Sequence, residues 1–382
     1  MNKRLINEVK KSFKNQFKTK PLFVFSPGRI NLIGEHTDYN DGFVFPAAIK
    51  KGIALAISKS DSNVSNVYAL NKEELYQFNI EDIKPIENGG WRNYVLGVVS
   101  ELQILGKHIG NFNSVFTGNI PGGAGMSSSA ALENSFVFGL NQLFELGLTK
   151  NEMILVSQKA EHNFAGVKCG IMDQYASMFG VKKSALFLDC RTIDSRPLKI
   201  DFKNYTLMLI NTNVKHELSE SAYNHRRAVC ENISKRLNVK ALRDVSKEDL
   251  EGIKNEISEE DYQKALYVIQ ENKRVKLFSE AIQEDDIKTL GKLLYQSHEG
   301  LSTQYKVSCA ELDFLVEKAK DNANVLGSRM MGGGFGGCTI NLILKSDFKR
   351  FKKDVSIRFQ KEFGNACSVY KVKLSKGTHT VK

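Results

Sequence analysis

The chain has 382 residues, of which 42% are hydrophobic and 25% charged, a composition typical of a globular protein with room for about two domains. No apolar run reaches the length of a transmembrane helix, which argues against a membrane protein. The net charge of +11 gathers at the ends, with +6 in residues 1–20, +7 in residues 347–382 and −2 between them. These basic runs lack interleaved aromatic residues, so they indicate solvated helix faces rather than a nucleic-acid platform, the alternative that charge alone leaves open.

The predicted elements mix helices and strands along the chain. Strands are expected at 22–25, 43–58 (one or two), 112–116, 185–188, 207–210, 339–344 and 369–374. Helices are expected at the N-terminus, at 91–105, 128–144 and 151–164, from near 171, through much of 216–320, and at 347–363. Residues 26–41 are expected as a loop, and a glycine-rich segment at 327–337 precedes the strand at 339–344. This mixture predicts an α+β protein, with a domain boundary near residues 190–205.

The six cysteines are widely scattered, without a CxxC pair or a Cys/His metal spacing. This usage predicts free thiols in a reducing compartment, and the basic N-terminus lacks a secretory apolar stretch. We therefore expect a cytoplasmic protein.

The glycine-rich segment 119–131, NIPGGAGMSSSAA, is the most informative stretch of the chain. Its glycines permit positive φ angles and close approach of a ligand, and a predicted helix follows directly. A helix N-terminus binds anions, phosphates above all, while serine hydroxyls add donors and oxygen ligands for a hard cation. A turn with serine caps is the simpler alternative for an isolated motif of this kind.

Two further segments favour a ligand-binding loop over a simple serine-capped turn. Residues 26–46, SPGRINLIGEHTDYNDGFVFP, place Arg29, Glu35, His36 and Asp38 within ten residues, a set suited to gripping a polyhydroxylated ligand. Residues 327–337, GSRMMGGGFGG, precede an apolar strand, and their glycines indicate backbone packed closely against another group, or a flexible loop.

In this order, the three segments resemble the three motifs of the GHMP kinase superfamily, and the first resembles the galactokinase signature. Residues 28–39 are similar to that signature without a break, and the second segment is similar to P-x-G-x-G-L-S-S-S-A, with Met126 in place of Leu. Further similarity runs through residues 160–162, 169–174, 223–227 and 307–313. The resemblance spans about residues 20–345 and implies a two-lobed GHMP-kinase-like fold with the active site between the lobes. We expect lobes at 1–195 and 196–382, with the C-terminal tail packing back on the first.

The resemblance implies ATP-dependent phosphorylation of the anomeric hydroxyl of a galactose-like sugar, with Mg²⁺. Asp173 matches the general base of the family and Arg29 the arginine paired with it; a structural ion pair is the alternative. Glu161 and Ser129 match the ligands of the cation. The residues that match the sugar-binding positions are Glu35, His36, Thr37, Asp38, Gly170 and Tyr223. Those that match the nucleotide-binding positions are Gly123, Ala124, Gly125, Met126, Ser127, Ser128 and Ser129.

Two other functions stay open on this resemblance. A sibling kinase would act on N-acetylgalactosamine or another galactose-like sugar. A non-catalytic sugar-sensing regulator would use the same fold, but such a protein is expected to lose the serine loop or the base, which are present here. The expected partners are a small sugar and ATP, without nucleic acid or membrane, and the chain is expected to be a monomer.

Overall fold

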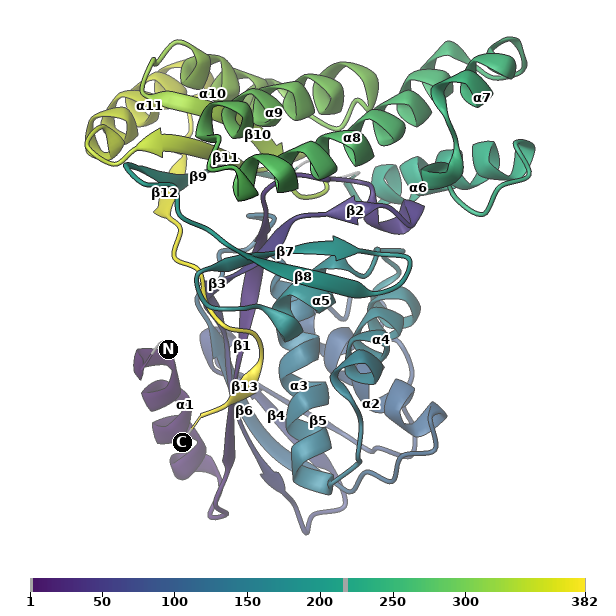
Figure 1. Cartoon of the computed structure of the whole chain (residues 1–382). Coiled ribbons are helices and arrows are strands. Elements are labelled where there is room, and N and C mark those ends of the chain that lie inside the picture. Colours follow the sequence, from purple (N-terminus) through teal and green to yellow (C-terminus); the bar gives the residue numbers. More distant parts are fainter. Residues whose placement is uncertain (1–2, 216–218, 382) are drawn as a thin grey trace.

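The structure is a computed structural model that describes residues 3–215 and 219–381. Figure 1 shows two bodies stacked along the long axis of the molecule, each a β-sheet covered by helices. The helices are α1 (Lys3–Gln16), α2 (Trp91–Ile104), α3 (Ser128–Phe144), α4 (Lys150–Ala160), α5 (Met172–Phe179), α6 (Ser219–Arg236), α7 (Lys247–Gly252), α8 (Glu259–Gln283), α9 (Ile287–Glu299), α10 (Ala310–Lys320) and α11 (Phe348–Phe363). Within the described residues, none of these helices has the length and apolarity needed to cross a bilayer.

The first body is built on a six-stranded sheet of order β13-β1-β3-β6-β4-β5. Its strands are β1 (Leu22–Asn31), β3 (Pro46–Lys59), β4 (Ser65–Ala69), β5 (Glu74–Phe78), β6 (Phe112–Gly118) and β13 (His379–Thr380). Successive residues of β1 serve opposite faces, as the alternation of a strand requires. Val24 joins the core beneath α2–α5, whereas Phe25 joins the core beneath α1 with Val9 and Phe13.

The second body contains a four-stranded antiparallel sheet of order β10-β11-β9-β12. Its strands are β9 (Tyr205–Lys215), β10 (Val325–Met331), β11 (Gly336–Leu344) and β12 (Ser368–Lys371). Met208 and Ile210 pack with α10 and α11, whereas Leu207 and Leu209 join a core shared with the first segment and the glycine-rich loop. This shared core is what places the second sheet directly above the loop.

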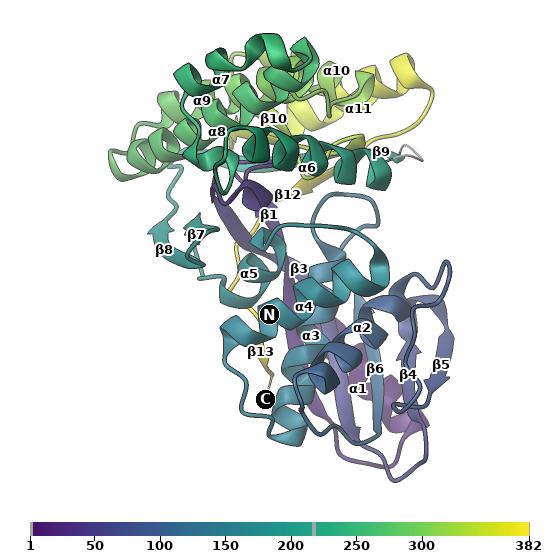
Figure 2. The ribbon, with the colours of Figure 1, turned by 90° about the vertical axis from the view of Figure 1, so that its right-hand side faces the viewer.

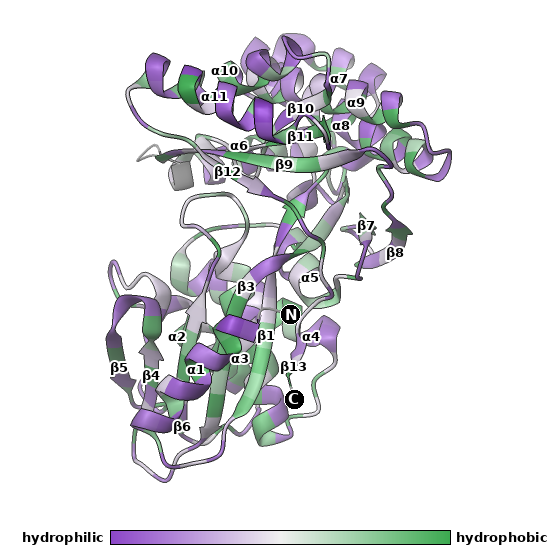
Figure 3. Cartoon of the chain, turned by 90° about the vertical axis from the view of Figure 1, so that its left-hand side faces the viewer, coloured by the Kyte–Doolittle hydropathy of each residue, from purple (hydrophilic) through white to green (hydrophobic). Residues whose placement is uncertain are grey.

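Two features join the bodies. A three-stranded sheet of β2 (Phe43–Val44), β7 (Ser184–Asp189) and β8 (Asp194–Lys199) lies between them. After β12 the chain returns to the first body, where β13 pairs with β1, so both termini lie on the same body in Figure 2. Figure 3 shows hydrophilic residues on α1 and α11, the basic ends of the sequence, as on other surface elements such as α7 and β5.

The mixed content confirms the α+β prediction, and α3 begins and ends at the predicted residues. The loop predicted from residue 26 was wrong in its first part, because β1 continues to Asn31 and Arg29 therefore lies on a strand. The glycine-rich segment at 327–337 is mostly strand, with only residues 332–335 between β10 and β11. The predicted helical region begins at residues 216–218, which lie outside the described residues; from Ser219 to Lys320 it is largely helical.

Candidate active site

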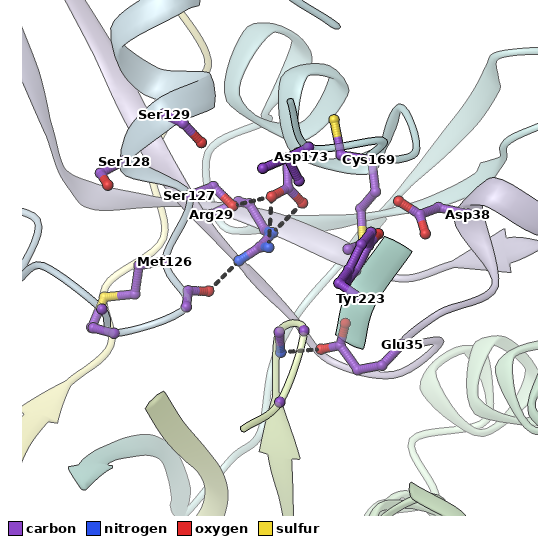
Figure 4. A pocket seen from close by; sticks show the side chains of 18 of the residues that line it. Arg29, Glu35, Asp38, Met126, Ser127, Ser128, Ser129, Cys169, Asp173 and Tyr223 are labelled. Atoms are coloured by element: carbon purple, nitrogen blue, oxygen red, sulfur yellow. Dashed lines mark hydrogen bonds and ion pairs between the residues drawn. The ribbon is translucent and has the colours of Figure 1, made fainter. Parts of the chain in front are cut away.

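The three segments singled out in the sequence meet around one cavity of about 290 Å³. Figure 4 shows how side chains from β1, from the loop before α3 and from α5 turn toward it. Fourteen of the sixteen residues predicted to form the site line it: Arg29, Glu35, His36, Asp38, Gly123, Ala124, Gly125, Met126, Ser127, Ser128, Ser129, Glu161, Asp173 and Tyr223.

Arg29 and Asp173 form a bidentate ion pair at the centre of the cavity. The Nε and Nη2 atoms of Arg29 donate to the two oxygens of Asp173 at 2.7 and 2.8 Å. The hydroxyl of Ser127 donates to the same carboxylate at 2.5 Å, and Arg29 also donates to the carbonyl of Gly125. Burial alone would lower the pKa of Arg29, but the charges of Asp173, Glu35 and Asp38 together with the hydrogen bond to Asp173 outweigh it, so the pKa is raised. The bidentate contact orients the Asp173 carboxyl group rigidly.

The glycine-rich loop adopts the backbone that its composition predicted. Gly123, Gly125 and Ser127 have positive φ angles, and α3 begins at Ser128, so its free N–H groups lie beside the loop. A Cβ on Gly125 would lie 3.0 Å from the carbonyl of Met331, which means that the turn after β10 packs directly on the loop. Of the packed-backbone and flexible-loop alternatives for residues 327–337, the structure shows the packed one.

Glu161 follows α4 in a π-helical turn, Glu161–Ala165, which carries its carboxyl group toward the loop serines. Burial and the charge of Asp173 raise its pKa to about 7, although hydrogen bonds from Ser129, Cys169 and Gln174 oppose this shift. Glu133 lies nearby and is fully buried, and burial raises its pKa well above the usual value. Carboxylates packed together in this way, with a serine hydroxyl beside them, are the oxygen donors that Mg²⁺ prefers.

The described residues contain no cluster of three or more His, Cys, Asp or Glu side chains arranged around a metal position. Mg²⁺ suits such a sparse site, because it retains waters and takes further oxygens from substrate phosphates. Glu161 and Ser129 therefore fit this ion only in company with a nucleotide.

Glu35 and Asp38 supply carboxylates on the opposite side of the cavity. Glu35 accepts from the backbone N–H of Gly332 at 2.9 Å and pairs with Arg329 at 3.1 Å. Among the described residues, no ion pair joins Asp38 to a lysine or arginine; burial first, and then the charges of Asp173 and Glu35, raise its pKa to about 7. The ring of Tyr223 lies beside that of His36, with centroids 5.3 Å apart.

Both ring nitrogens of His36 form hydrogen bonds within the protein. Burial lowers its pKa to about 3, so the ring is neutral. Its Nε2 lies 3.2 Å from the carbonyl of Gly333 and its Nδ1 lies 2.8 Å from the hydroxyl of Tyr39. The carbonyl can only accept, so Nε2 carries the proton and Nδ1 accepts from Tyr39. His36 therefore meets the cavity with its ring rather than with a free nitrogen.

Thr37 and Gly170, both predicted to contact the sugar, lie outside the lining. The hydroxyl of Thr37 is directed to the carbonyls of Gly34 and Phe43, at 2.9 and 2.7 Å, and holds the turn in shape. Gly170 packs against Asp38 so closely that a Cβ would lie 2.1 Å from a carboxylate oxygen. Both residues therefore support the wall of the cavity and do not line its interior.

Sequence reasoning missed three buried polar residues behind the cavity wall, Arg329, Gln174 and Glu133, and did not predict that Cys169 and Met172 line the cavity. Arg329 is fully buried and lies in the segment whose glycines alone drew attention in the sequence. Gln174 follows Asp173 directly, and Glu133 is one helical turn beyond Ser129. The helical spacing of Ser129 and Glu133 was the available signal, since residues four apart share a face.

Comparisons with known proteins agree over the whole chain. Family models match at residues 11–59 (galactokinase galactose-binding signature), 93–181 (GHMP kinases N terminal domain) and 278–361 (GHMP kinases C terminal). The galactokinase of Clostridium tetani is 40% identical over 387 residues, covering 100% of this chain and 99% of that protein. The galactokinase of Thermotoga petrophila is 39% identical over 358 residues, covering 94% and 99%.

Solved structures give the same picture. Lactococcus lactis galactokinase complexed with galactose superposes with a TM-score of 0.93 at 34% identity, covering 97% of this chain and 98% of the other. Methanococcus jannaschii mevalonate kinase has a TM-score of 0.66 at 18% identity, covering 94% and 100%. The second likeness concerns the fold alone, and together they confirm the GHMP kinase fold.

Proposed function

The chain belongs to the galactokinase family of the GHMP kinases, and on that premise we propose how its residues divide the work of the reaction. The enzyme phosphorylates the C1 hydroxyl of galactose with ATP and releases galactose 1-phosphate and ADP for galactose catabolism. Neither alternative, a sibling kinase for another sugar or a non-catalytic regulator, is favoured by these relatives.

Asp173 orients the C1 hydroxyl and accepts its proton as the oxygen bonds to the γ-phosphorus of ATP. The observation that carries this proposal is the bidentate contact with Arg29, which fixes both carboxylate oxygens at the place where three motifs meet. One charge-assisted pair leaves carboxylate lone pairs for the hydroxyl. The guanidinium also faces the phosphoryl group in transfer, where positive charge stabilises the transition state.

The loop residues 123–129 and the N-terminus of α3 bind the phosphates of ATP, because their N–H groups are free and the helix dipole favours anions. Glu161 and Ser129 hold Mg²⁺ with those phosphates. The ion, when bound, neutralises phosphate charge during transfer. Glu35, Asp38 and Tyr223 bind sugar hydroxyls, while His36, Thr37 and Gly170 shape that wall.

Galactose specificity follows from the buried carboxylates. A misplaced hydroxyl would leave a buried acceptor unpaired, at a cost of about 1–3 kcal/mol for each group. We further propose that the lobes divide at residues 195 and 196, and that the enzyme acts as a cytoplasmic monomer.

The proposal is tested first by ATP consumption with galactose, glucose, 2-deoxygalactose, N-acetylgalactosamine and arabinose in the presence of magnesium. Galactose should be turned over best. Asp173→Asn should reduce kcat by roughly 10²–10⁴-fold, in the range of general-base loss. Galactose affinity, measured by titration calorimetry, should stay within roughly tenfold, because binding and chemistry are separable. A folded variant with unchanged kcat would remove Asp173 from the reaction.

A further inference from the structure

A buried polar cluster lies directly behind Glu161, and the reaction described so far does not use it. Gln174 and Glu133 are both fully buried. The Nε2 atom of Gln174 lies 2.8 Å from Oε2 of Glu161 and 3.3 Å from Oε2 of Glu133. A side-chain amide has two N–H groups, so one can be donated to each carboxylate. Gln174 is thus a bridge between an acidic residue that lines the cavity and one that does not.

Three helices hold this bridge in place. Gln174 comes from α5, Glu133 from α3, and Glu161 from the π-helical turn after α4. Asn134 of α3 donates to the backbone carbonyl of Gln174 at 2.9 Å and accepts from Ser157 of α4, also at 2.9 Å. The position of the Gln174 amide is therefore set by packed helices rather than by a loop, which is the requirement for a precise site.

The neutrality of Gln174 is the second part of the argument. In the part of the chain that the structure describes, no ion pair joins a lysine or arginine to Glu133 or Glu161. A lysine in place of Gln174 would orient Glu161 equally well but would neutralise it. An amide orients the carboxylate and leaves its negative charge for a cation in the cavity.

We propose that Gln174, which is hydrogen-bonded to Glu133, is a positioning residue that orients the Glu161 carboxylate toward the nucleotide-bound divalent cation. This inference rests on the proposed function, in which Glu161 is a ligand of that cation. Removal of a residue that is hydrogen-bonded to a metal ligand typically lowers metal affinity or activity by roughly 10–100-fold.

The test removes the amide and keeps its volume. Gln174→Met should raise the concentration of Mn²⁺ needed for half-saturation, measured by electron paramagnetic resonance with saturating ADP, by roughly 10–100-fold. Galactose affinity without nucleotide should change less than about twofold, which also reports that the variant is folded. Gln283→Met is the matched control, because the Gln283 amide donates within its own helix, to the carbonyl of Ser279, at the C-terminal end of α8. It should leave both measurements unchanged.

The support from Glu133 is tested separately. Glu133→Gln keeps a carbonyl that can accept from Gln174, and should behave nearly as the wild type. Glu133→Met removes that acceptor and should weaken Mn²⁺ binding in the same direction as Gln174→Met. Should Gln174→Met fail to fold, this pair and Gln174→Asn, whose shorter side chain cannot reach both carboxylates, make the same test.

A double-mutant cycle distinguishes this proposal from the one on which it rests. If Gln174 acts through Glu161, its replacement should have no further effect on Mn²⁺ binding in a Glu161→Gln background. Mn²⁺ binding that falls in Glu161→Gln but stays within twofold of wild type in folded Gln174→Met overturns the positioning role alone. An equal loss in both backgrounds overturns it as well. Unchanged Mn²⁺ binding in Glu161→Gln removes Glu161 from the cation, and with it the metal part of the proposed function.

Discussion

At the scale of single residues, the carboxyl of Asp38 gives the clearest dependence on pH. Its pKa is raised from 3.8 to about 7 by burial first and then by Asp173 and Glu35. Between these values the unfolded chain has lost the proton and the folded chain keeps it, so the stability of the free protein falls as the pH rises from about 4 to 7. Asp38→Asn should therefore stabilise the free protein at pH 8 by about 1–3 kcal/mol and weaken galactose binding.

Urea unfolding at pH 5 and pH 8 measures this effect, with galactose titration as the functional readout. The stability gain of Asp38→Asn should be present at pH 8 and much smaller at pH 5, where the wild-type carboxyl is protonated. A gain that is the same at both pH values would contradict the assignment of the shift to Asp38.

Arg329 is a second residue whose effect follows from burial. Its guanidinium donates to Glu35 at 3.1 Å and to the carbonyls of Leu32, Met330 and Asn31 at 2.8, 2.6 and 2.5 Å. Arg329→Met would leave a buried carboxylate unpaired, at a cost of about 3–5 kcal/mol in unfolding free energy. Adding Glu35→Gln should recover part of that loss, because the unpaired charge is gone. A double variant less stable than Arg329→Met would contradict this account.

Arg29, which was predicted from the sequence, and Arg329, which was not, show which site residues a sequence can reveal. The residues of the first two motifs could be identified because each motif is a short continuous run of sequence that resembles a family signature. Arg329 could not, because its value to the site is a contact with Glu35 across almost 300 positions of sequence. The contact of His36 with Gly333 was missed for the same reason. The hydrogen bonds of Thr37 are local, to Gly34 and Phe43, but they depend on the shape of the folded turn.

At the scale of elements, the turn between β10 and β11 connects both halves of the site. Gly332 donates to Glu35 and Gly333 faces His36. Gly334 has a φ of +87°, and a Cβ there would lie 2.1 Å from the carbonyl of Val307. From the sequence, these glycines indicated either closely packed backbone or a flexible loop. The sequence could not show that β10 begins well before them, because a Gly-Ser-Arg run is typical of a loop as well as of a strand.

Gly334→Ala should therefore be compared with Gly364→Ala. Gly364 ends α11 with a φ of +75° and open space around it. Its replacement by alanine therefore costs only the backbone strain of a positive φ angle, about 1–2 kcal/mol. Gly334→Ala adds a collision with backbone, and should destabilise the protein further and raise the KM for galactose. Thermal unfolding and initial rates measure both. Equal effects of the two substitutions would mean that the turn moves aside freely.

At the scale of the whole molecule, the C-terminal tail fastens the second body to the first. It passes from β12 to β13, which pairs with β1 through Val24 and Thr380. The sequence predicted that the tail packs back, through resemblance alone. The contacts themselves could not be predicted, because short polar residues such as Ser26 and Thr378 are as common in solvated loops as in buried junctions.

The same junction reaches the helix that carries Asp173. The hydroxyl of Thr378 lies 2.9 Å from that of Ser26 and donates to the carbonyl of Ser177 at 3.0 Å, and Ser177 is one turn beyond Asp173 on α5. Thr378→Val keeps the shape of the side chain and removes its hydroxyl from both contacts, although the backbone N–H of residue 378 still donates to the Ser177 carbonyl at 2.9 Å. The loss of the hydroxyl should cost about 0.5–1.5 kcal/mol of stability. Because α5 is then less firmly held, kcat should also fall, by about two- to tenfold, with galactose affinity little changed.

Thr303→Val is the matched control, since Thr303 is exposed and its hydroxyl donates only within its own helical turn, to Glu299. It should change neither property. Guanidinium unfolding and steady-state kinetics at saturating ATP measure both variants. A loss of stability in Thr378→Val without any change in kcat would show that the tail stabilises the fold while Asp173 is held by Arg29 and Ser127 alone. A parallel fall would make the tail part of what keeps the base in place, and would give the pairing of β13 with the edge of the first sheet a role in catalysis as well as in stability.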